Sequence, residues 1–418
     1  MPQAIHLVGI GGVGMSALAQ AYLDAGFAVT GADRALDAPG PRPGVLAALA
    51  RQGVRLFPDD GTGVGPGTAR VVVSTAIEET NRDLRRARAH GLPVVHRAAA
   101  LAELLTPRRL VAVAGTCGKS TVTAILGHLL AESGFDPVVV NGAQVVGWDA
   151  GGTRVGSARK GAGAYAVAEV DESDKSLVAF RPYAAVVTNA SADHYPKAEM
   201  DAVFDAFVRG VPGPVVDGRR TPIVPSAVAR TIPLPGEHNA VNAECALRMA
   251  AALGAAPARL AAAIRTFPGV ERRLQRVGTC GGAAVYDDYA HNPEKLHAML
   301  ATLQAAYPKG VAVVWRPHGY APLRKTLEAL AAMFRAALRP CDELLVLPVY
   351  DAGGTAERAL NSDALVARLD ASPVRLVEDL EDAEARLRTH APAFGALVVA
   401  GARDPGLPVL ARRLAGKE

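Results

Sequence analysis

The chain has 418 residues, of which 50% are apolar and 21% charged, and its formal net charge is +4. This length exceeds one ordinary hydrophobic core, so we expect two or three domains. The 45 basic residues are scattered among acids, with no dense block of the kind that tracks a phosphate backbone, which excludes a nucleic-acid partner. No apolar run reaches the ~18 residues of a membrane helix, so we expect no membrane insertion.

The cysteines indicate a reducing compartment. They are far apart and form no C-x-x-C pair, which disfavours both a zinc site and a disulfide framework; they are Cys117, Cys245, Cys280 and Cys341. The chain opens directly into an apolar stretch without a basic leader. We therefore expect a cytoplasmic protein.

The first hundred residues begin with a glycine-rich turn. The apolar stretch Ala4–Val8 predicts a strand, Gly9-Ile-Gly-Gly-Val-Gly14 a tight turn, and Ala17–Ala25 a helix. A second strand, Ala28–Ala32, ends at Asp33. This is the first unit of a Rossmann-like domain, in which the glycines cradle a diphosphate and the aspartate meets a ribose or sugar hydroxyl. We expect a nucleotide ligand, with NAD the less favoured choice because this motif alone is weak evidence.

Alternation of strands and helices continues to Pro107. We expect further strands at 54–57, 69–74 and 92–95, and helices at 81–90 and 98–105. Residues 1–107 are therefore predicted to form a doubly wound α/β domain.

A second glycine-rich turn carries a lysine. The apolar run Leu110–Ala114 predicts a buried strand, and a helical pattern follows from Thr121 to Leu130. Between them stands Gly115-Thr-Cys-Gly-Lys-Ser-Thr121, although Val113 occupies the place of the first glycine of the common phosphate-loop pattern. Glycines expose backbone N–H groups to phosphate oxygens, the lysine bridges the β- and γ-phosphates, and a hydroxyl ligates Mg²⁺. The sequence predicts a nucleoside triphosphate site here.

Acidic residues follow the next buried strand. A strand at 164–168 places Glu169 and Asp171 at its carboxyl end, where ligands bind in open α/β sheets. Carboxylates beside a phosphate loop are suited to holding Mg²⁺, although a solvated acidic loop remains the alternative. His194 follows the strand 184–189 in the same way, as a metal ligand or as a polar loop residue.

Polar residues also gather at the start of a later helix, which is predicted to run from Gly236 to Leu253. His238, Asn239 and Asn242 lie in its first turns. An asparagine amide suits an adenine edge because it donates and accepts side by side, whereas a simple helix cap is the alternative.

The last third of the chain repeats the α/β pattern. After the break Phe267-Pro-Gly269, a strand at 283–288 ends in Asp287 and Asp288, and His291 precedes a helix that starts at a proline. We expect four more strands, at 311–315, 343–347, 374–376 and 396–400. The predicted fold class is α/β in three domains: Rossmann-like (1–107), a central P-loop ATPase-type α/β domain (108–269) and a second Rossmann-like domain (270–418).

Taken together, the motifs resemble the Mur ligase family. The resemblance is to the branch that joins UDP-N-acetylmuramate to L-alanine and to its murein-peptide recycling relative. It rests on a series of motifs that stand in the family's order: the two glycine-rich loops, Val72–Ile77, Val94–Ala98, the acidic Glu169-Val-Asp-Glu-Ser-Asp174, Asn189–His194, Gly236-Glu-His-Asn239 and Asp287-Asp-Tyr-Ala-His-Asn-Pro293. It covers all three predicted domains.

The resemblance implies a role for each motif. The first domain is expected to bind the UDP-sugar through Gly9, Ile10, Gly11, Gly12, Val13, Gly14, Met15, Asp33, Ser74, Thr75, Ala76 and Arg97. ATP is expected at Gly115, Thr116, Cys117, Gly118, Lys119, Ser120, Thr121, His238, Asn239, Asn242, Arg273 and Asp288. The implied Mg²⁺ ligands are Ser120, Glu169 and His194. The implied catalytic residues are Lys119, Glu169, His194, Arg273 and His291.

The implied reaction is an ATP-dependent ligation. The carboxylate of UDP-N-acetylmuramate attacks the γ-phosphate of ATP, and an amine then displaces phosphate from the resulting acyl phosphate. The cofactors are ATP and Mg²⁺, and the partners are UDP-N-acetylmuramate and an amino acid or short peptide. A monomer or homodimer is expected.

Departures from the family pattern concern the acceptor. Cys117 replaces a usual histidine and Asn292 a second one, and Gly319 and Pro322 stand where the branch has two arginines. Neither can replace an arginine as a carboxylate partner, so Arg316 or Arg324 becomes the candidate. L-alanine is therefore the favoured acceptor, with a recycling ligase that attaches a peptide or another amino acid as the alternative. A Rossmann oxidoreductase and a catalytically silent nucleotide-binding protein are remoter alternatives.

Overall fold

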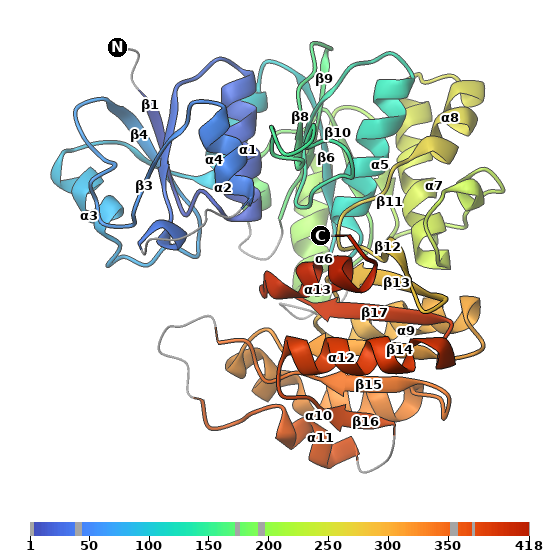
Figure 1. Ribbon diagram of the computed structural model, residues 1–418. Coiled ribbons are helices and arrows are strands. Elements are labelled where there is room, and N and C mark those ends of the chain that lie inside the picture. The colour runs from blue at the N-terminus through green and yellow to red at the C-terminus, as the bar shows by residue number, and fades with distance from the viewer. Residues whose placement is uncertain are drawn as a thin grey trace. The chain divides into compact units, whose positions relative to one another are not determined.

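The computed structural model describes residues 4–37, 44–171, 176–190, 197–351, 358–369 and 373–417 (Figure 1). The chain divides into two compact units. The first comprises Met1–Pro233 with Asn239–Val270, and the second Leu234–His238 with Glu271–Glu418. Within the described ranges the strands form three sheets, two in the first unit and one in the second.

The N-terminal sheet has the strand order β3-β2-β1-β4-β5, and all its pairs are parallel. Its strands are β1 (Ala4–Val8), β2 (Val29–Ala32), β3 (Arg55–Phe57), β4 (Thr68–Val73) and β5 (Val94–His96). The helices among them are α1 (Val13–Asp24), η1 (Arg34–Leu36), α2 (Gly44–Arg51), α3 (Arg82–Ala89) and α4 (Arg97–Leu105). This order is that of a Rossmann-like sheet.

The central sheet has the order β11-β10-β6-β9-β7-β8, with β8 antiparallel to β7 and the other pairs parallel. Its strands are β6 (Arg109–Ala114), β7 (Val138–Val140), β8 (Ala158–Arg159), β9 (Tyr165–Glu169), β10 (Ala184–Val187) and β11 (Val215–Asp217). The helices of this region are α5 (Lys119–Glu132), η2 (Ser176–Ala179), α6 (Lys197–Arg209), η3 (Ala229–Thr231), α7 (Glu237–Ala252), α8 (Pro257–Ala263) and η4 (Ile264–Thr266).

One apolar core joins the two sheets of the first unit. The cluster includes β1, α1 and α4 residues such as Leu18 and Leu101, together with Ala112 and Ala168 of the central sheet. Polar bonds reinforce it, since the Gln20 side chain of α1 accepts a hydrogen bond from Val155 N at 3.0 Å. Burial of this apolar surface holds the glycine-rich start of α1 in a fixed position within the unit.

The sheet of the second unit has the order β12-β13-β17-β14-β15-β16, and only β12 runs antiparallel to its neighbour among these described strands. Its strands are β12 (Gln275–Cys280), β13 (Ala283–Asp288), β14 (Val311–Arg316), β15 (Glu343–Val346), β16 (Val374–Leu376) and β17 (Ala396–Gly401). The helices are α9 (Pro293–Ala306), α10 (Tyr320–Ala337), α11 (Asp363–Leu369), α12 (Leu380–His390), η5 (Ala391–Ala393) and α13 (Gly406–Leu414).

Alternation along these strands builds two separate cores. Val398 of β17 packs with α9, α10 and α11 on one face, whereas Val399 packs with α12 and α13 on the other. Because successive strand residues point to opposite faces, each apolar strand serves both layers.

The α/β fold class predicted from the sequence is confirmed, and so are the expected strands and the proline-started helix α9. The edge strand β12 and the short β8 were not expected, because Arg276, Gly278 and the glycine-rich stretch before Arg159 resemble loop sequence. The domain boundaries at residues 107 and 269 remain predictions. None of the helices in the described part of the chain combines the length and apolarity needed to cross a membrane.

Candidate functional site

Three parallel strands of the central sheet end side by side. In β6, Val113 pairs with Glu169 of β9 and Ala114 with Val187 of β10. The loops that follow these strands, at 115–118, 170–171 and 188–190, therefore leave the sheet at the same carboxyl edge. We call these three loops the phosphate-loop edge.

The loop after β6 is a strand–turn–helix phosphate loop. Gly115 and Gly118 have φ angles of +127° and +85°, which side-chain-bearing residues rarely adopt. The space beside them is also filled, since a Cβ on Gly118 would lie 2.5 Å from Asn242 Oδ1. Helix α5 begins at Lys119 and buries Ser120 and Thr121 in its first turn, so its free N–H groups face the loop.

Two side chains to which the sequence assigned no role hold this loop from the β10 side. Asn189 Oδ1 accepts a hydrogen bond from Cys117 N at 2.9 Å, and Asn189 Nδ2 donates to Cys117 O at 3.0 Å. Thr188 Oγ1 donates to the same carbonyl at 2.6 Å. Their sequence position could have indicated this role, because they directly follow a buried strand whose carboxyl end lies at the edge where the phosphate loop was expected.

One acidic residue approaches the loop lysine from the β9 side, and a second bonds to the neighbouring loop. Lys119 Nζ lies 3.9 Å from Asp171 Oδ1. Glu169 Oε2 accepts a hydrogen bond from Gly142 N at 2.7 Å, in the loop after β7. The phosphate loop and the acidic motif, which are separate in the sequence, thus meet at one edge of the sheet.

The oxygen donors at this edge suit magnesium. Mg²⁺ keeps several waters and binds through one or two carboxylates together with substrate phosphates. Ser120 offers a hydroxyl and Glu169 a carboxylate, and these are hard oxygen ligands. Over the described ranges no group of three His, Cys, Asp or Glu residues forms a protein-only metal site. His194, the third expected ligand, lies outside the described residues.

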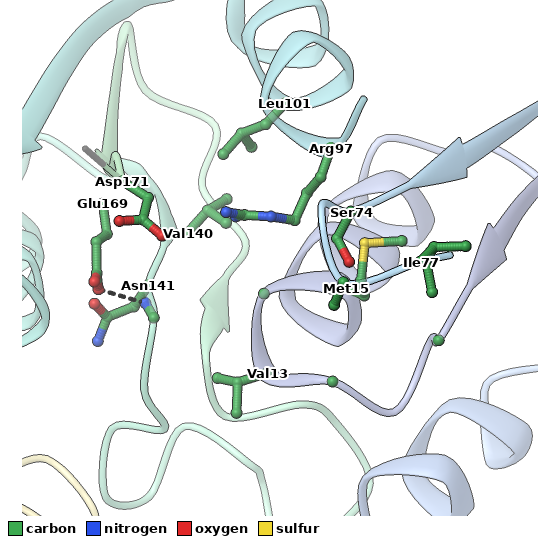
Figure 2. A pocket seen from close by; sticks show the side chains of 15 residues that line it. Val13, Met15, Ser74, Ile77, Arg97, Leu101, Val140, Asn141, Glu169 and Asp171 are labelled. Carbon is green, nitrogen blue, oxygen red and sulfur yellow. Dashed lines mark hydrogen bonds between the residues drawn. The ribbon is translucent and has the colours of Figure 1, made fainter. Parts of the chain in front are cut away.

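A cavity of about 380 Å³ connects the first glycine loop with the acidic residues (Figure 2). Among the residues predicted to bind the UDP-sugar, those that line it are Gly9, Gly12, Val13, Gly14, Met15, Ser74, Ala76 and Arg97. Asn141, Glu169 and Asp171 line it from the central sheet. Figure 2 shows the Arg97 side chain extending from α4 into the space between these two groups.

Arg97 is a cationic side chain that lines this cavity. Its Nη1 lies 3.0 Å from where a Cβ of Gly14 would stand, so the glycine admits the guanidinium over the start of α1. Within the described part of the chain it has no ion pair. A guanidinium beside a helix N-terminus is an arrangement suited to a diphosphate.

The remaining predicted UDP-sugar residues do not line this cavity. Ile10 is fully buried, and Gly11 N donates to Asp33 Oδ2 at 2.8 Å. The other carboxylate oxygen of Asp33 accepts from Ala35 N at 3.0 Å. Asp33 therefore fixes the glycine loop, and its contact with a sugar hydroxyl remains a prediction, as does the role of Thr75.

The predicted adenine residues fall into different units. Asn239 and Asn242 are buried at the start of α7 in the first unit, where Asn242 lies against Gly118. His238 belongs to the second unit and is exposed.

In the second unit, Arg273 stands in a constrained turn. Its neighbours Arg272 and Leu274 have φ angles of +57° and +45°. Asp288 Oδ2 accepts from Leu274 N at 2.6 Å, and its Oδ1 accepts from Ala290 N at 2.7 Å. Arg273 stacks on the Tyr289 ring at 5.5 Å and has no ion pair in the described ranges. Asp288 thus shapes the turn that presents Arg273, while its predicted ribose contact is untested.

His291 forms a pair with His318, which the sequence reasoning did not select. Their ring centroids lie 4.8 Å apart. Burial, together with the charge of Lys295, lowers the pKa of each histidine to about 4, so both rings are neutral at neutral pH. His291 Nδ1 lies 2.9 Å from Tyr289 O, and since a carbonyl only accepts, that nitrogen carries the hydrogen and Nε2 keeps its lone pair.

Comparison with known proteins places these features in a family. The Mur ligase family, catalytic domain, matches residues 4–109, and the Mur ligase glutamate ligase domain matches residues 272–403. A UDP-N-acetylmuramate–L-alanine ligase of Methylobacterium radiotolerans is 34% identical, over 91% of this chain and 90% of the relative. The chain belongs to the Mur ligase family.

Other comparisons agree. A UDP-N-acetylmuramate–L-alanine ligase of Xanthomonas campestris is 35% identical, over 88% of this chain and 87% of the relative. The fold is shared with a UDP-N-acetylmuramate–alanine ligase structure from Thermotoga maritima, with a TM-score of 0.81 at 24% identity over 99% of this chain and 98% of that one. A murein peptide ligase from Psychrobacter arcticus has a TM-score of 0.66 at 21% identity over 99% of this chain and 98% of the other.

Membership of the Mur ligase family decides between the classes of function that the sequence left open. It favours a ligase over a Rossmann oxidoreductase, because it gives the loop at Lys119 and the acids beside it a purpose.

Proposed function

We propose that this Mur ligase joins the carboxylate of UDP-N-acetylmuramate to an amino acid, most simply L-alanine, at the expense of ATP. The observation that carries the proposal is the shared cavity, in which the glycine loop and Arg97 face Glu169 and Asp171. Lys119 lies 3.9 Å from Asp171, so the ATP-type loop adjoins the same space. A sugar nucleotide held on one wall would bring its acid group toward a triphosphate on the other.

The chemistry asked of the chain is positioning and charge neutralisation. A carboxylate oxygen of the sugar acid forms a bond to the γ-phosphorus, and ADP leaves. The acceptor amine then attacks the acyl carbon, and phosphate departs with that oxygen. Lys119 and the N–H groups at the start of α5 would stabilise the phosphate oxygens, and the hydrogen bond from Cys117 N to Asn189 supports the loop in its strained shape.

Bound Mg²⁺ would neutralise phosphate charge and orient the triphosphate, with Ser120 and Glu169 as its protein ligands. The roles of His194, His238, Arg273, Asp288 and His291 toward ATP, metal and acceptor remain part of the proposal. A cytoplasmic location and a monomeric or dimeric state also stay predictions.

The proposal is tested by an acceptor screen. ADP release is measured with ATP, Mg²⁺ and UDP-N-acetylmuramate, adding each amino acid or short peptide in turn. We expect release that requires the sugar nucleotide and is fastest with L-alanine.

Other outcomes revise or end the proposal. Turnover with a peptide alone would contradict the L-alanine assignment and indicate a recycling ligase. Absence of release with every acceptor, from a protein that binds ATP, would contradict the ligase function.

A further inference from the structure

The sheet of the second unit has a change of direction at β17. The connection after β17 leads to α13, which packs on the face built around Val399, whereas those after β13 and β14 lead to α9 and α10 on the opposite face. β17 lies between β13 and β14 in the sheet. Adjacent strands whose connections leave on opposite faces open a crevice at their carboxyl ends, which is where open α/β sheets bind ligands.

Three loops meet at that crevice, and we call them the histidine edge (289–292, 317–319 and 402–405). Register places them together, because Gly401 pairs with Arg316 of β14 and Ala400 with Asp288 of β13. His291 and His318 come from two of the loops and touch as an aromatic pair. Arg403 comes from the third, two residues after its strand, as His318 does.

Arg403 is held in an unusual backbone conformation. Its φ is +62°. Asp404 N donates a hydrogen bond to Ala402 O at 2.7 Å, so Arg403 is the central residue of a three-residue turn. A side-chain-bearing residue in the left-handed region costs roughly 1–2 kcal/mol, and such strain gathers at functional sites. Its guanidinium is exposed and has neither a hydrogen bond nor an ion pair in the described ranges.

The charge around this crevice is positive. The charge of Arg403 contributes to lowering the pKa of His318, and that of Arg273 contributes to lowering the pKa of His291. The nearby acids are already engaged, since Asp404 Oδ2 accepts from Arg316 Nη1 at 2.7 Å. An anion is the ligand that suits this arrangement of charges.

Arg316 and Arg324 were the arginines that the sequence offered as carboxylate partners. Arg316 is committed to Asp404 and also donates through Nε to Pro348 O at 3.0 Å. Arg324, on α10, likewise has a partner of its own. Both arginines therefore already interact within the protein, whereas Arg403 is open to a ligand.

We propose that the Arg403 guanidinium, with His318 beside it, binds the α-carboxylate of the acceptor amino acid. This rests on the proposed ligase function and adds to it the residue that recognises the acceptor. The two nucleotide substrates have glycine loops for their phosphates in the first unit, whereas the acceptor is the substrate without one. Every free amino acid carries a carboxylate, and a guanidinium binds that group through two parallel hydrogen bonds.

The test uses Arg403→Gly in the full chain. Glycine adopts a positive φ without strain, so the variant is expected to remain folded. Arg375→Ala is the matched control, because Arg375 is a 60% exposed arginine of the same sheet, paired with Glu343 at 3.6 Å. ADP release is measured against the concentrations of L-alanine, L-alaninamide, ATP and UDP-N-acetylmuramate.

We expect the KM for L-alanine to rise about 30-fold in Arg403→Gly, as for loss of a charged hydrogen-bonding partner. The KM values for ATP and UDP-N-acetylmuramate and the kcat should stay near those of the wild type. The preference for L-alanine over L-alaninamide should be lost in this variant and kept in Arg375→Ala and Arg403→Lys.

An unchanged KM for L-alanine, or an unchanged preference over the amide, would overturn the assignment of Arg403 while leaving the ligase function intact. A rise in the KM for ATP instead would assign Arg403 to a phosphate and overturn it as well. If the wild type releases no ADP with any amino acid, the proposed function itself fails, which is a distinct result.

Discussion

The phosphate-loop edge and the histidine edge both lie at the carboxyl ends of parallel strands, but the first presents mainly backbone groups and the second side chains. The first is made from backbone, with Gly115 and Gly118 at positive φ and Asn189 bonded to the loop on both sides. The second is made from single side chains, namely His291, His318 and Arg403, from three separate loops.

The difference follows from the ligands that each edge is proposed to take. A triphosphate carries many oxygens, and a row of N–H groups satisfies them without side-chain entropy. A carboxylate has two oxygens, which one guanidinium satisfies. An edge made from backbone should tolerate no change of shape, whereas an edge made from side chains should tolerate substitution with loss of one substrate only.

The largest effect is expected at the phosphate-loop edge. Lys119→Ala removes the cation beside Asp171, and we expect kcat/KM for ADP release to fall on the order of 10³-fold. Lys160→Ala, at an exposed lysine, serves as the control. Turnover in Lys119→Ala equal to that of the control would remove the loop from the mechanism.

A smaller loss is expected when the backbone of the loop is released. Asn189→Ala deletes both hydrogen bonds to Cys117, and we expect kcat/KM to fall roughly 10- to 100-fold, because each bond contributes about 1 kcal/mol to holding the strained loop. Thr188→Val removes one bond to the same carbonyl and should lose less. If both variants kept wild-type kinetics, the loop would not depend on this support.

Replacing a glycine at one edge and introducing one at the other should change the free energy of unfolding in opposite directions. Gly118→Ala places a Cβ 2.5 Å from Asn242 Oδ1 at a φ of +85°, and we expect the free energy of unfolding to fall by about 2 kcal/mol or more. Arg403→Gly relieves strain at a φ of +62°, and we expect a gain of roughly 0.5 kcal/mol after the added entropy of the unfolded chain. Urea unfolding measures both changes, and shifts of the same sign would refute the contrast.

Stability should also depend on pH through the histidine edge. The pKa values of His291 and His318 are lowered to about 4 from 6.5. Between those values the unfolded chain binds more protons than the folded one, so the free energy of unfolding rises with pH in that window. We expect His318→Gln to flatten this rise.

The comparison with His318→Gln is needed because another titrating group changes the pH dependence of stability in the opposite direction. Burial raises the pKa of Asp287 to about 6, which lowers stability as pH rises toward that value. The difference between wild type and His318→Gln cancels this contribution. The window from about pH 4 to pH 6.5 is set by the folded and the ordinary pKa of His318. If the difference in the free energy of unfolding between wild type and His318→Gln is constant across it, burial does not keep this histidine neutral.

The two edges also differ in how far the sequence predicts them. The phosphate-loop edge was predictable because its glycines, lysine and hydroxyls are adjacent in the chain and follow an apolar strand. Asn189 stands in a motif of the family, but its role in holding the loop was not predicted, because the two residues that it joins are 72 positions apart and no local pattern reports a long-range contact. For the same reason the sequence did not reveal the contact of His6 Nε2 with Asp83 Oδ1, which lie 3.6 Å apart and are fully buried.

The histidine edge was predictable only in part. His291 stands in a recognisable motif, and the strands around it were anticipated. The role of Arg403 depends on β17 lying between β13 and β14, which strand periodicity does not reveal. Its positive φ, usual for glycine, is equally invisible in the sequence.

In the proposed reaction, ATP held at the loop around Lys119 phosphorylates the carboxylate of the sugar nucleotide before the amine attacks. This order of steps can be followed with UDP-N-acetylmuramate labelled with heavy oxygen in that carboxylate, by mass analysis of the phosphate released during turnover with ATP and the acceptor. We expect one labelled oxygen in each phosphate formed, because the phosphate departs with the carboxylate oxygen that attacked ATP. Unlabelled phosphate, whose fourth oxygen comes from solvent, released while the amide product forms, would contradict this order of steps.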